Sequence, residues 1–325
     1  MKRVALALFW LCAGALALGT SHAFAQSYPT KPVRLVVPFA PGGAIDLMGR
    51  YYGQKLSDIW KQQVIVDNRA GAGSNIGANV VAKSTPDAYT LLINSAAQAI
   101  SAALYRKQPF DPVKDFTPVS QLSSNWPMLV GNLKLPAGSV KELIALARSS
   151  PGKLNYGSAG MGSSAHLAGE LFKSLAGIDI VHVPYKGDAA MMPSLIADDV
   201  QFSFLPMAVA LTQIKSGRLR ALAVTGARRI ATAPEVPTVK ETGLSEYEFS
   251  GWVGIFAPGG TPRDIVNQIS AELARVLGMP DVQERVRSWG YEPVGSTPEE
   301  FAAKYRADIG VYRKIIRDAK VPLID

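Results

Sequence analysis

Short apolar runs alternate with amphipathic stretches along most of this chain. Residues 33–37, 63–68 and 90–95 are apolar runs of strand length that are rich in valine, leucine and isoleucine. Apolar positions recur at helical spacing from Ala44 onward and again over residues 74–83. Strands that alternate with helices favour an α/β fold with a doubly wound parallel sheet.

The alternation breaks at residues 109–118, a proline-rich and charged stretch. Short extended segments follow at residues 117–122 and 128–131, on either side of Trp126 and Pro127. We interpret this region as a crossing into a second domain, because the alternation of strands and helices then starts again. The expected helices cover residues 140–148, 164–176, 189–197 and 207–215, and the expected strands cover residues 154–157, 180–185, 200–205 and 219–225.

A long apolar run at residues 247–256 predicts a strand that carries the chain back to the first domain. The remaining pattern is helical, and Pro262 and Pro298 occupy helix-starting positions behind threonine caps. Helices are expected over residues 262–277, 282–289 and 298–319. We therefore predict two α/β lobes, each a mixed sheet flanked by helices, formed by residues 26–122 with 251–325 and by residues 123–250.

The first 25 residues have the pattern of a secretory signal peptide. Lys2 and Arg3 precede an apolar run at residues 4–18, and residues 23–25 form an A-x-A cleavage site. We expect Sec-dependent export to the periplasm with cleavage after Ala25. The mature chain of about 300 residues then contains no cysteine, so a hydrophobic core rather than disulfide bonds must stabilise it.

The mature composition argues against nucleic-acid and metal binding. Without the two basic residues of the signal, 32 Lys and Arg residues face 26 Asp and Glu residues, and no basic block exceeds two residues. Aromatic residues are not interleaved with basic ones, as a nucleic-acid surface would require. His166 and His182 are the two mature histidines, and neither has the spacing of a metal site. We expect no metal and no cofactor.

The segment after the first strand has the features of an anion-binding turn. Residues 38–43 (PFAPGG) stop the strand, and a helix begins at Ala44. This geometry points backbone N–H groups and the positive end of a helix dipole at the sheet edge. Alternatively, the glycines only permit a tight turn. Asp46 either favours the helix dipole or accepts a hydrogen bond from a ligand, and Phe39 either packs on a ligand or closes the lobe.

The second predicted lobe contains a similar turn at residues 158–164. Gly160, Gly162 and Ala165 match a dinucleotide fingerprint in outline, but the next strand ends in Pro-Tyr-Lys at residues 184–186 rather than in an acidic residue. Export from the cell also argues against a nicotinamide cofactor. We interpret this turn as a second anion seat that faces the first.

The histidines leave two alternatives open for this turn. His166 lies in the first turn of its helix, where it either reaches the cleft or caps the helix, whereas His182 is expected to pack in a strand. A nucleophile pair of Ser163 and His166 would make the protein a secreted serine hydrolase. No G-x-S-x-G elbow and no third triad member accompany this pair, so we predict a binding protein rather than an enzyme.

Several motifs resemble one family of bacterial receptors. They are YPTKPVRLVVPFAPGGAID, VIVDNRAGAGSNIGA, NYGSAGMGSSAHLAGELFK, VHVPYKG, SGRLRALAVTG, PEVPTVKETG and GIFAPGGTP. The chain is similar to the Bug receptors, the TctC-type periplasmic components of tripartite tricarboxylate transporters. The resemblance implies a two-lobed periplasmic binding protein of the type II-like Venus-flytrap class, expected to be a monomer. It also implies capture of a small organic carboxylate, held by residues 39–43 and by residues 158–163.

The ligand expected from this resemblance is a di- or tricarboxylate, an aromatic acid or an amino acid, delivered to membrane subunits of the transporter. A receptor that informs a sensor kinase without transport is the alternative. Where many relatives have an aspartate, this chain has FSFLPM at residues 202–207, which indicates a ligand with a hydrophobic or aromatic body. Lobe closure is expected at a hinge near Gln121 and Gly251. The expected ligand-binding residues are Phe39, Ala40, Pro41, Gly42, Gly43, Asp46, Ser95, Gln98, Ser158, Ala159, Gly160, Gly162, Ser163, His166, Tyr185 and Leu205.

Overall fold

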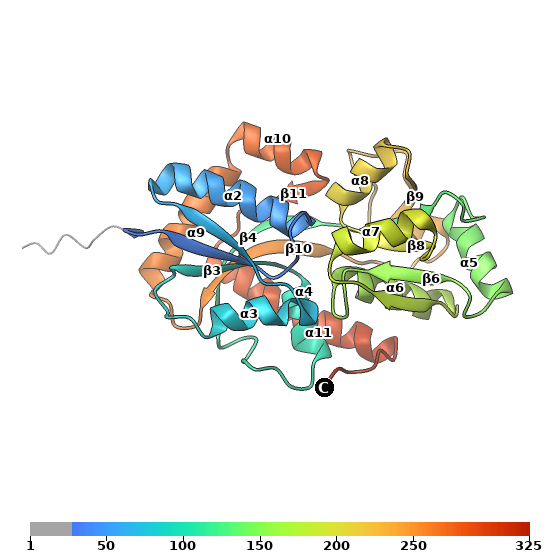
Figure 1. Ribbon diagram of the computed structural model, residues 1–325, viewed down its shortest axis with the longest axis horizontal. Helices are drawn as coiled ribbons and strands as arrows, with labels where there is room; N and C mark the ends of the chain where they lie inside the picture. The colour runs from blue at the N-terminus through green and yellow to red at the C-terminus, as the bar shows by residue number, and fades with distance from the viewer. Residues whose placement is uncertain (1–27) are drawn as a thin grey trace, which may run out of the picture. The chain divides into compact units, whose positions relative to one another are not determined.

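Two β-sheets organise the part of the chain that the computed structural model describes, residues 28–325. The expected signal peptide, its cleavage site and the first two residues of the expected mature chain lie outside these residues. Residues 31–325 form one compact unit that contains both sheets. In Figure 1 the first sheet occupies the left of this unit and the second sheet the right.

The first sheet has six strands in the order β11-β4-β10-β3-β1-β2. β1 pairs in parallel with β2 and β3, whereas β10 runs antiparallel to β3 and β4. The doubly wound parallel sheet that the alternation favoured is therefore wrong, because a strand returning from late in the chain enters with the opposite direction. The bounds are β1 (Val33–Val37), β2 (Val64–Asn68), β3 (Thr90–Ser95), β4 (Phe116–Asn125), β10 (Gly251–Pro258) and β11 (Tyr291–Pro293).

The second sheet has five strands in the order β7-β6-β8-β5-β9. β6 is parallel to β7 and β8, while β5 is antiparallel to β8 and β9. Both sheets are thus mixed and flanked by helices, which confirms the predicted fold class. The bounds are β5 (Met128–Asn132), β6 (Asn155–Ser158), β7 (Val181–Pro184), β8 (Phe202–Leu205) and β9 (Leu219–Val224).

Helices cover the faces of both sheets (Figure 1). Those from the segments of the first sheet are α2 (Ala44–Trp60), η1 (Ala72–Ser74), α3 (Asn75–Ala82), α4 (Ala97–Leu104), α9 (Arg263–Leu277), α10 (Pro280–Ser288) and α11 (Pro298–Asp318). Those from the segments of the second sheet are α5 (Val140–Ser149), α6 (Ser164–Ala176), α7 (Asp188–Ala197), α8 (Met207–Lys215) and η2 (Lys240–Thr242). The pattern of apolar residues did not predict α4 or the short strand β11. None of the helices in residues 28–325 is both long and apolar enough to cross a bilayer.

The chain passes from the first sheet to the second through two residues, Trp126 and Pro127, which separate β4 from β5. The return strand begins at Gly251 rather than at Tyr247 as predicted. Tyr247 and Phe249 are buried, but the Tyr247 hydroxyl donates to the Ala168 carbonyl and the Phe249 N–H donates to the Thr225 carbonyl. Their apolar character therefore reflects packing against the second sheet and not membership of the strand.

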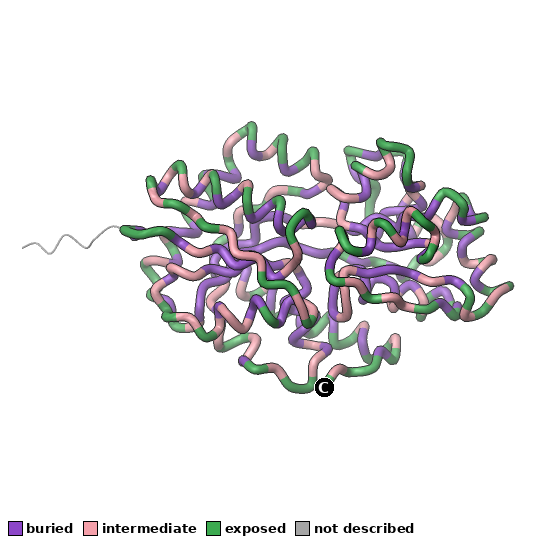
Figure 2. Tube along the Cα trace, in the orientation of Figure 1, coloured by how far each residue is buried: buried purple, intermediate pink, exposed green. Residues whose placement is uncertain are grey.

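Aromatic side chains form the centre of the core beneath the first sheet. Trp252 and Phe256 of β10 pack on Phe301 of α11 with ring centroids 5.1 and 4.9 Å apart. These rings are almost fully buried, and Figure 2 shows the buried residues concentrated along the strands of both sheets. Burial of large rings contributes most of the hydrophobic stabilisation, so the strand edges that carry the turns are held on a rigid base.

Candidate functional site

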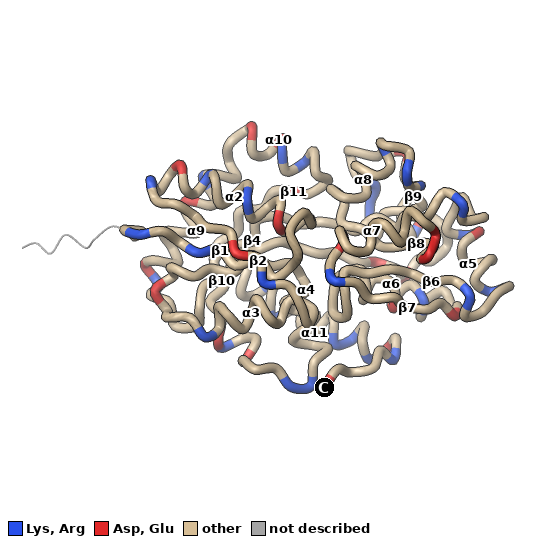
Figure 3. Tube along the Cα trace, viewed as in Figure 1, with Lys and Arg blue, Asp and Glu red and all other residues tan. Residues whose placement is uncertain are grey.

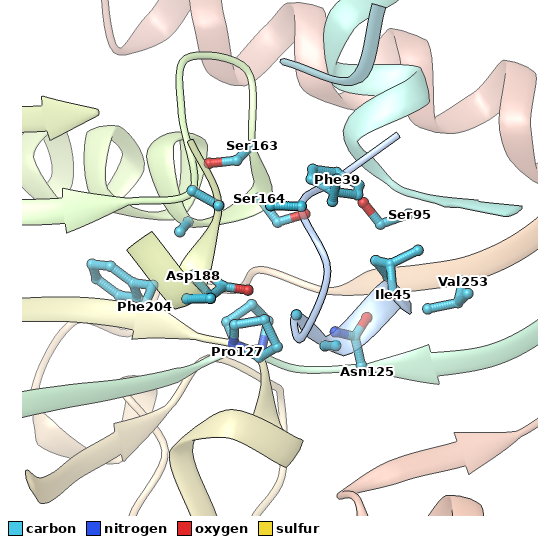
Figure 4. Close-up of a pocket in the computed structure, with 18 of the residues that line it drawn as sticks. Phe39, Ile45, Ser95, Asn125, Pro127, Ser163, Ser164, Asp188, Phe204 and Val253 are labelled. Carbon is cyan, nitrogen blue, oxygen red and sulfur yellow. The ribbon is translucent and has the colours of Figure 1, made fainter. Parts of the chain in front are cut away.

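Three helix N-termini line one cavity between the two sheets. α2 contributes its first residues from the first sheet, and α6 and α7 contribute theirs from the second. The cavity encloses about 60 Å³, and Figure 4 shows side chains from both sheets around it. The lining residues at these N-termini are Gly43, Ala44 and Ile45 of α2, Ser163, Ser164 and Ala165 of α6, and Gly187, Asp188 and Ala189 of α7.

The turn before α2 leaves backbone N–H groups without a side-chain cap at residues that line the cavity. Gly43 is the N-cap residue, and without a side chain it cannot cap the N–H groups of the first turn. Gly42 adopts φ +84°, a left-handed conformation that favours glycine. Uncapped N–H groups and the helix dipole make this end of α2 suited to an anion.

Asp46 braces this turn from within. Its carboxylate accepts hydrogen bonds from the Gly42 N–H at 2.9 Å, from Asn68 Nδ2 at 2.9 Å and from Arg50 Nε at 3.1 Å. Burial raises the pKa of the Asp46 carboxyl, but these hydrogen bonds and the Arg50 charge outweigh it, so the pKa lies below its ordinary value. The geometry supports the structural alternative for Asp46, because its carboxylate is occupied by protein donors.

The turn before α6 is formed by two glycines and a capping serine. Gly160 and Gly162 have φ +125° and +78°, and Ser163 Oγ accepts a hydrogen bond from the His166 backbone N–H at 3.2 Å. The imidazole of His166 instead accepts from the Gly162 N–H through Nδ1, at 3.3 Å. Ser163 therefore acts as a helix cap, and its hydroxyl is not paired with the imidazole as a nucleophile would be.

The two histidine rings contact each other at a tilt next to this turn. Their rings lie 4.4 Å apart, and His182 Nε2 is 2.7 Å from Ser158 Oγ. Burial lowers the pKa of His166 to about 4, and burial together with the His166 charge lowers that of His182 to about 3. Both rings are neutral near pH 7, and neither histidine lines the cavity. Residues 28–325 contain no group of three His, Cys, Asp or Glu side chains arranged to hold a metal ion.

The structure divides the residues predicted from the sequence into three groups. The first lines the cavity and consists of Phe39, Ala40, Gly43, Ser95, Ala159 and Ser163. The second, Gly160 and Tyr185, lines an adjoining cavity of about 490 Å³, which shares Phe39, Ala159 and Gly187 with the first cavity. The third lies around the cavities without lining either and consists of Pro41, Gly42, Asp46, Gln98, Ser158, Gly162, His166 and Leu205.

For two residues of the third group, Leu205 and Gln98, the packing explains why they line neither cavity. Leu205 is buried in β8, while its neighbours Phe204 and Pro206 line the cavity, because successive strand residues face opposite sides. Gln98 is buried as well, and its Oε1 accepts a hydrogen bond from Asn94 Nδ2 at 2.8 Å. Both side chains belong to the packing behind the cavity.

Sequence reasoning missed several lining residues that come from strand ends. They include Asn125 at the end of β4, Pro127 in the crossing, Val253 in β10 and Tyr291 in β11. No motif marks these positions, since only the pairing of distant strands brings them together. Asp188 carried one signal, an acidic residue directly after a glycine turn, but that pattern is also typical of an ordinary helix start.

Charge at the cavity is sparse. Figure 3 shows Lys and Arg interspersed with Asp and Glu over the elements of both sheets. Among the described residues that line the first cavity, Asp188 is the one with an acidic side chain, and none is Lys or Arg. Backbone dipoles and hydroxyl groups, rather than basic side chains, are therefore available to hold an anion here.

Comparison with known proteins identifies the family. A model for the tripartite tricarboxylate transporter family receptor, TctC, matches residues 48–319. The chain belongs to this family. TctC proteins are receptors and not enzymes, which confirms the prediction of a binding protein over that of a hydrolase.

TctC relatives resemble this chain over nearly its whole length. A Pseudomonas sp. (strain P51) protein described as the UPF0065 protein in the tcbD-tcbE intergenic region is 38% identical over 310 residues, covering 93% of this chain and 91% of its own. The structure of R. palustris Rpa4515 with adipate has a TM-score of 0.88 at 36% identity, covering 90% of this chain and 98% of its own. The structure of the periplasmic binding protein BugD has a TM-score of 0.87 at 31% identity, covering 91% of this chain and 99% of its own. This TctC chain thus has the fold of a periplasmic binding protein.

Proposed function

We propose that this protein captures a small organic carboxylate in the cavity between its two sheets and delivers it to a tripartite tricarboxylate transporter. The observation that carries the proposal is the convergence of three helix N-termini on one cavity whose described lining contains no basic side chain. Helix N-termini carry partial positive charge and stabilise an anion, so a ligand carboxylate can bind here without a basic side chain. The adipate bound to the relative Rpa4515 is a ligand of this chemical class.

In this proposal the ligand carboxylate binds against the turns before α2 and α6. Proposed direct contacts are the cavity-lining residues Phe39, Ala40, Gly43, Ser95, Ala159 and Ser163. Phe204, Ile45 and Val253 supply an apolar wall, which suits a ligand with a hydrophobic body. We place the two lobes at residues 26–122 with 251–325 and at residues 123–250, with β4 carrying the first sheet on to Asn125, and we expect them to close on the ligand at a hinge near Gln121 and Gly251.

Replacement of Gly43 tests the proposal. Gly43→Pro removes one N–H group at the start of α2, and the backbone φ of −80° is close to the value that proline requires. We expect isothermal titration to show a loss of about 1.5–3 kcal/mol in carboxylate affinity, or about tenfold to a hundredfold in Kd. The titrated ligand is the best carboxylate from a thermal-shift screen of mono-, di- and tricarboxylates, aromatic acids and amino acids.

Gly43→Ala is the matched control for this experiment. It keeps the N–H group, and an added Cβ would lie no closer than 3.7 Å to the nearest neighbouring atom, the Ala40 carbonyl oxygen. Its affinity should stay near the wild-type value, and both variants should unfold at similar temperatures without ligand. Equal affinity of Gly43→Pro and the wild type would refute the role of the α2 N-terminus.

The location of the mature protein is part of the same proposal. Export with cleavage after Ala25 would place Gln26 at the mature N-terminus. Mass spectrometry of the protein from a periplasmic extract tests this directly. Deletion of the genes for the membrane transporter subunits would separate transport from sensing, because only a transport receptor requires those subunits for ligand uptake.

A further inference from the structure

Two acceptor oxygens in the cavity wall have no hydrogen-bond donor. Asp188 Oδ1 and Asn125 Oδ1 are both buried, and neither accepts a hydrogen bond from the described residues. The Asn125 side chain also hydrogen-bonds Tyr291, which leaves Oδ1 as its free acceptor. Both side chains line the cavity, and Figure 4 shows them on its lower side, around Pro127. Buried acceptors without donors are rare, because each costs free energy.

The surroundings of Asp188 do not compensate its charge. Burial raises the pKa of its carboxyl to about 6, with no contribution from a neighbouring cation. Near pH 7 the side chain is therefore largely ionised inside the cavity wall. Tyr291 beside it stays neutral, since burial and the Asp188 charge raise the pKa of its hydroxyl well above the ordinary value. The α7 dipole favours a carboxylate at this position, but burial outweighs that effect.

The polar groups of the cavity thus fall into two kinds. The N-termini of α2 and α6, with the hydroxyls of Ser95 and Ser164, supply hydrogen-bond donors suited to a carboxylate. Asp188 and Asn125 supply acceptors, one of them charged. A ligand that satisfies both kinds carries a negative group and a separate donor, and an ammonium group matches a buried carboxylate best in charge.

We propose that Asp188 is a specificity-determining residue that selects carboxylates bearing an ammonium group over dicarboxylates of the same length. The inference rests on the proposed function, because it requires that the ligand carboxylate binds at the α2 and α6 turns. A second carboxylate at the same place would meet Asp188 as a like charge, and such juxtapositions disfavour a ligand strongly. A hydroxyl group satisfies the acceptors without neutralising the charge, so its ligand ranks between the two.

Matched ligand pairs test the proposal by isothermal titration near pH 8, where Asp188 is ionised. The pairs are ε-aminocaproate with adipate and γ-aminobutyrate with succinate, which differ by an ammonium-bearing carbon in place of one carboxylate. ε-Hydroxycaproate is the intermediate. Wild-type protein should bind the ammonium member of at least one pair about tenfold or more tightly than its dicarboxylate partner. In Asp188→Asn, which keeps the side-chain shape, this preference should disappear or reverse.

Asp264→Asn is the matched control, because Asp264 is an exposed acidic residue in the first turn of α9 that lines neither cavity. It removes the same charge from a helix start and should leave the ligand preference unchanged. Dicarboxylates that bind the wild type as tightly as their ammonium partners, or a preference that survives in Asp188→Asn, would overturn the inference. If dicarboxylates bind as tightly as their ammonium partners and Gly43→Pro weakens their binding, the proposed function stands while the inference fails. If no carboxylate of the panel or of the thermal-shift screen binds, the proposed function fails and the inference with it.

Discussion

Asp46 and Asp188 show how far a residue's role depends on its neighbours. Both follow a glycine turn and lie in the first turn of a helix. Asp46 accepts hydrogen bonds from three protein donors, and its pKa is lowered. Asp188 has a buried oxygen without a donor, and its pKa is raised. The same local pattern therefore yields a carboxylate held by protein donors in α2 and a cavity-lining carboxylate with an unpaired oxygen in α7.

Asp188→Asn should stabilise the ligand-free protein at neutral pH. The folded-state pKa of about 6 exceeds the ordinary value of 3.8, so the stability associated with protonated Asp188 is fully present below pH 3.8 and lost as the pH rises through about 6. The variant avoids this loss, and we expect a gain of about 3 kcal/mol in the free energy of unfolding at pH 7. Urea unfolding at several pH values measures the gain, which should shrink toward pH 4.

A loss of stability in Asp188→Asn at pH 7 would contradict this prediction. It would mean that the favourable interaction with the α7 dipole exceeds the cost of burying the charge. Binding sites commonly keep such destabilising groups because the ligand satisfies them.

At the scale of the element, helix starts do two kinds of work in this protein. α5 and α6 both begin with a serine N-cap whose Oγ accepts a backbone N–H three residues later. The Ser139 cap of α5 lies away from both cavities, whereas the Ser163 cap of α6 lines the first. The two caps therefore separate the contribution of capping to stability from its contribution to the site.

Ser163→Ala and Ser139→Ala should each lower the free energy of unfolding by about 1 kcal/mol, because each removes one N-cap hydrogen bond. Only Ser163→Ala should also weaken binding of the carboxylate, since only the Ser163 cap lines the cavity. Chemical unfolding and isothermal titration on both variants measure the two effects. A similar change in affinity for both would show that Ser163 has no special place in the site.

At the scale of the whole molecule, the turns from the two sheets touch. A Cβ added at Gly73, in η1, would overlap the carbonyl oxygen of Met161 in the turn before α6. A Cβ at Gly187 would lie 3.7 Å from the Ala40 Cβ. The turns of the two sheets thus approach each other at glycines. If the lobes move apart to admit ligand, this close approach belongs to the closed state.

Gly73→Ala should hinder this approach. We expect the apparent ligand affinity to fall by about tenfold or more, because the added methyl group disfavours the arrangement in which both turns contact the ligand. Gly177→Ala is the control: Gly177 has φ +59°, close to the +60° of Gly73, but an added Cβ would meet no atom within 4 Å. Both variants should lose about 1–2 kcal/mol of stability from backbone strain.

Calorimetric titration and small-angle X-ray scattering, each with and without ligand, separate the two variants. Only Gly73→Ala should bind weakly and fail to become more compact with ligand. Wild-type affinity in Gly73→Ala would mean that the contact between Gly73 and Met161 is not needed for binding.

Much of the architecture was predictable because it is encoded locally. Residues 33–60 specify a strand, a glycine turn and a helix through apolar spacing and turn chemistry, and residues 154–176 do so again. The same stretches contain motifs distinctive enough to indicate the family. Five of the six predicted residues that line the cavity, including Phe39, Gly43 and Ser163, belong to these local units, and the sixth, Ser95, ends β3.

Tertiary structure alone decided how the strands pair and what completes the cavity. β10 enters the first sheet antiparallel between β3 and β4, although residues 126–250 separate it from β4 in the chain. This pairing brings Val253 to the cavity wall, and the pairing of β11 with β4 brings Tyr291 there, while Asp188 lines the same cavity from α7. Spacing along a chain reports what one segment does by itself, whereas the environment of a buried carboxylate depends on contacts between segments far apart in sequence. The sequence alone therefore predicted the two turns, and the fold determined which acidic residue lines the cavity.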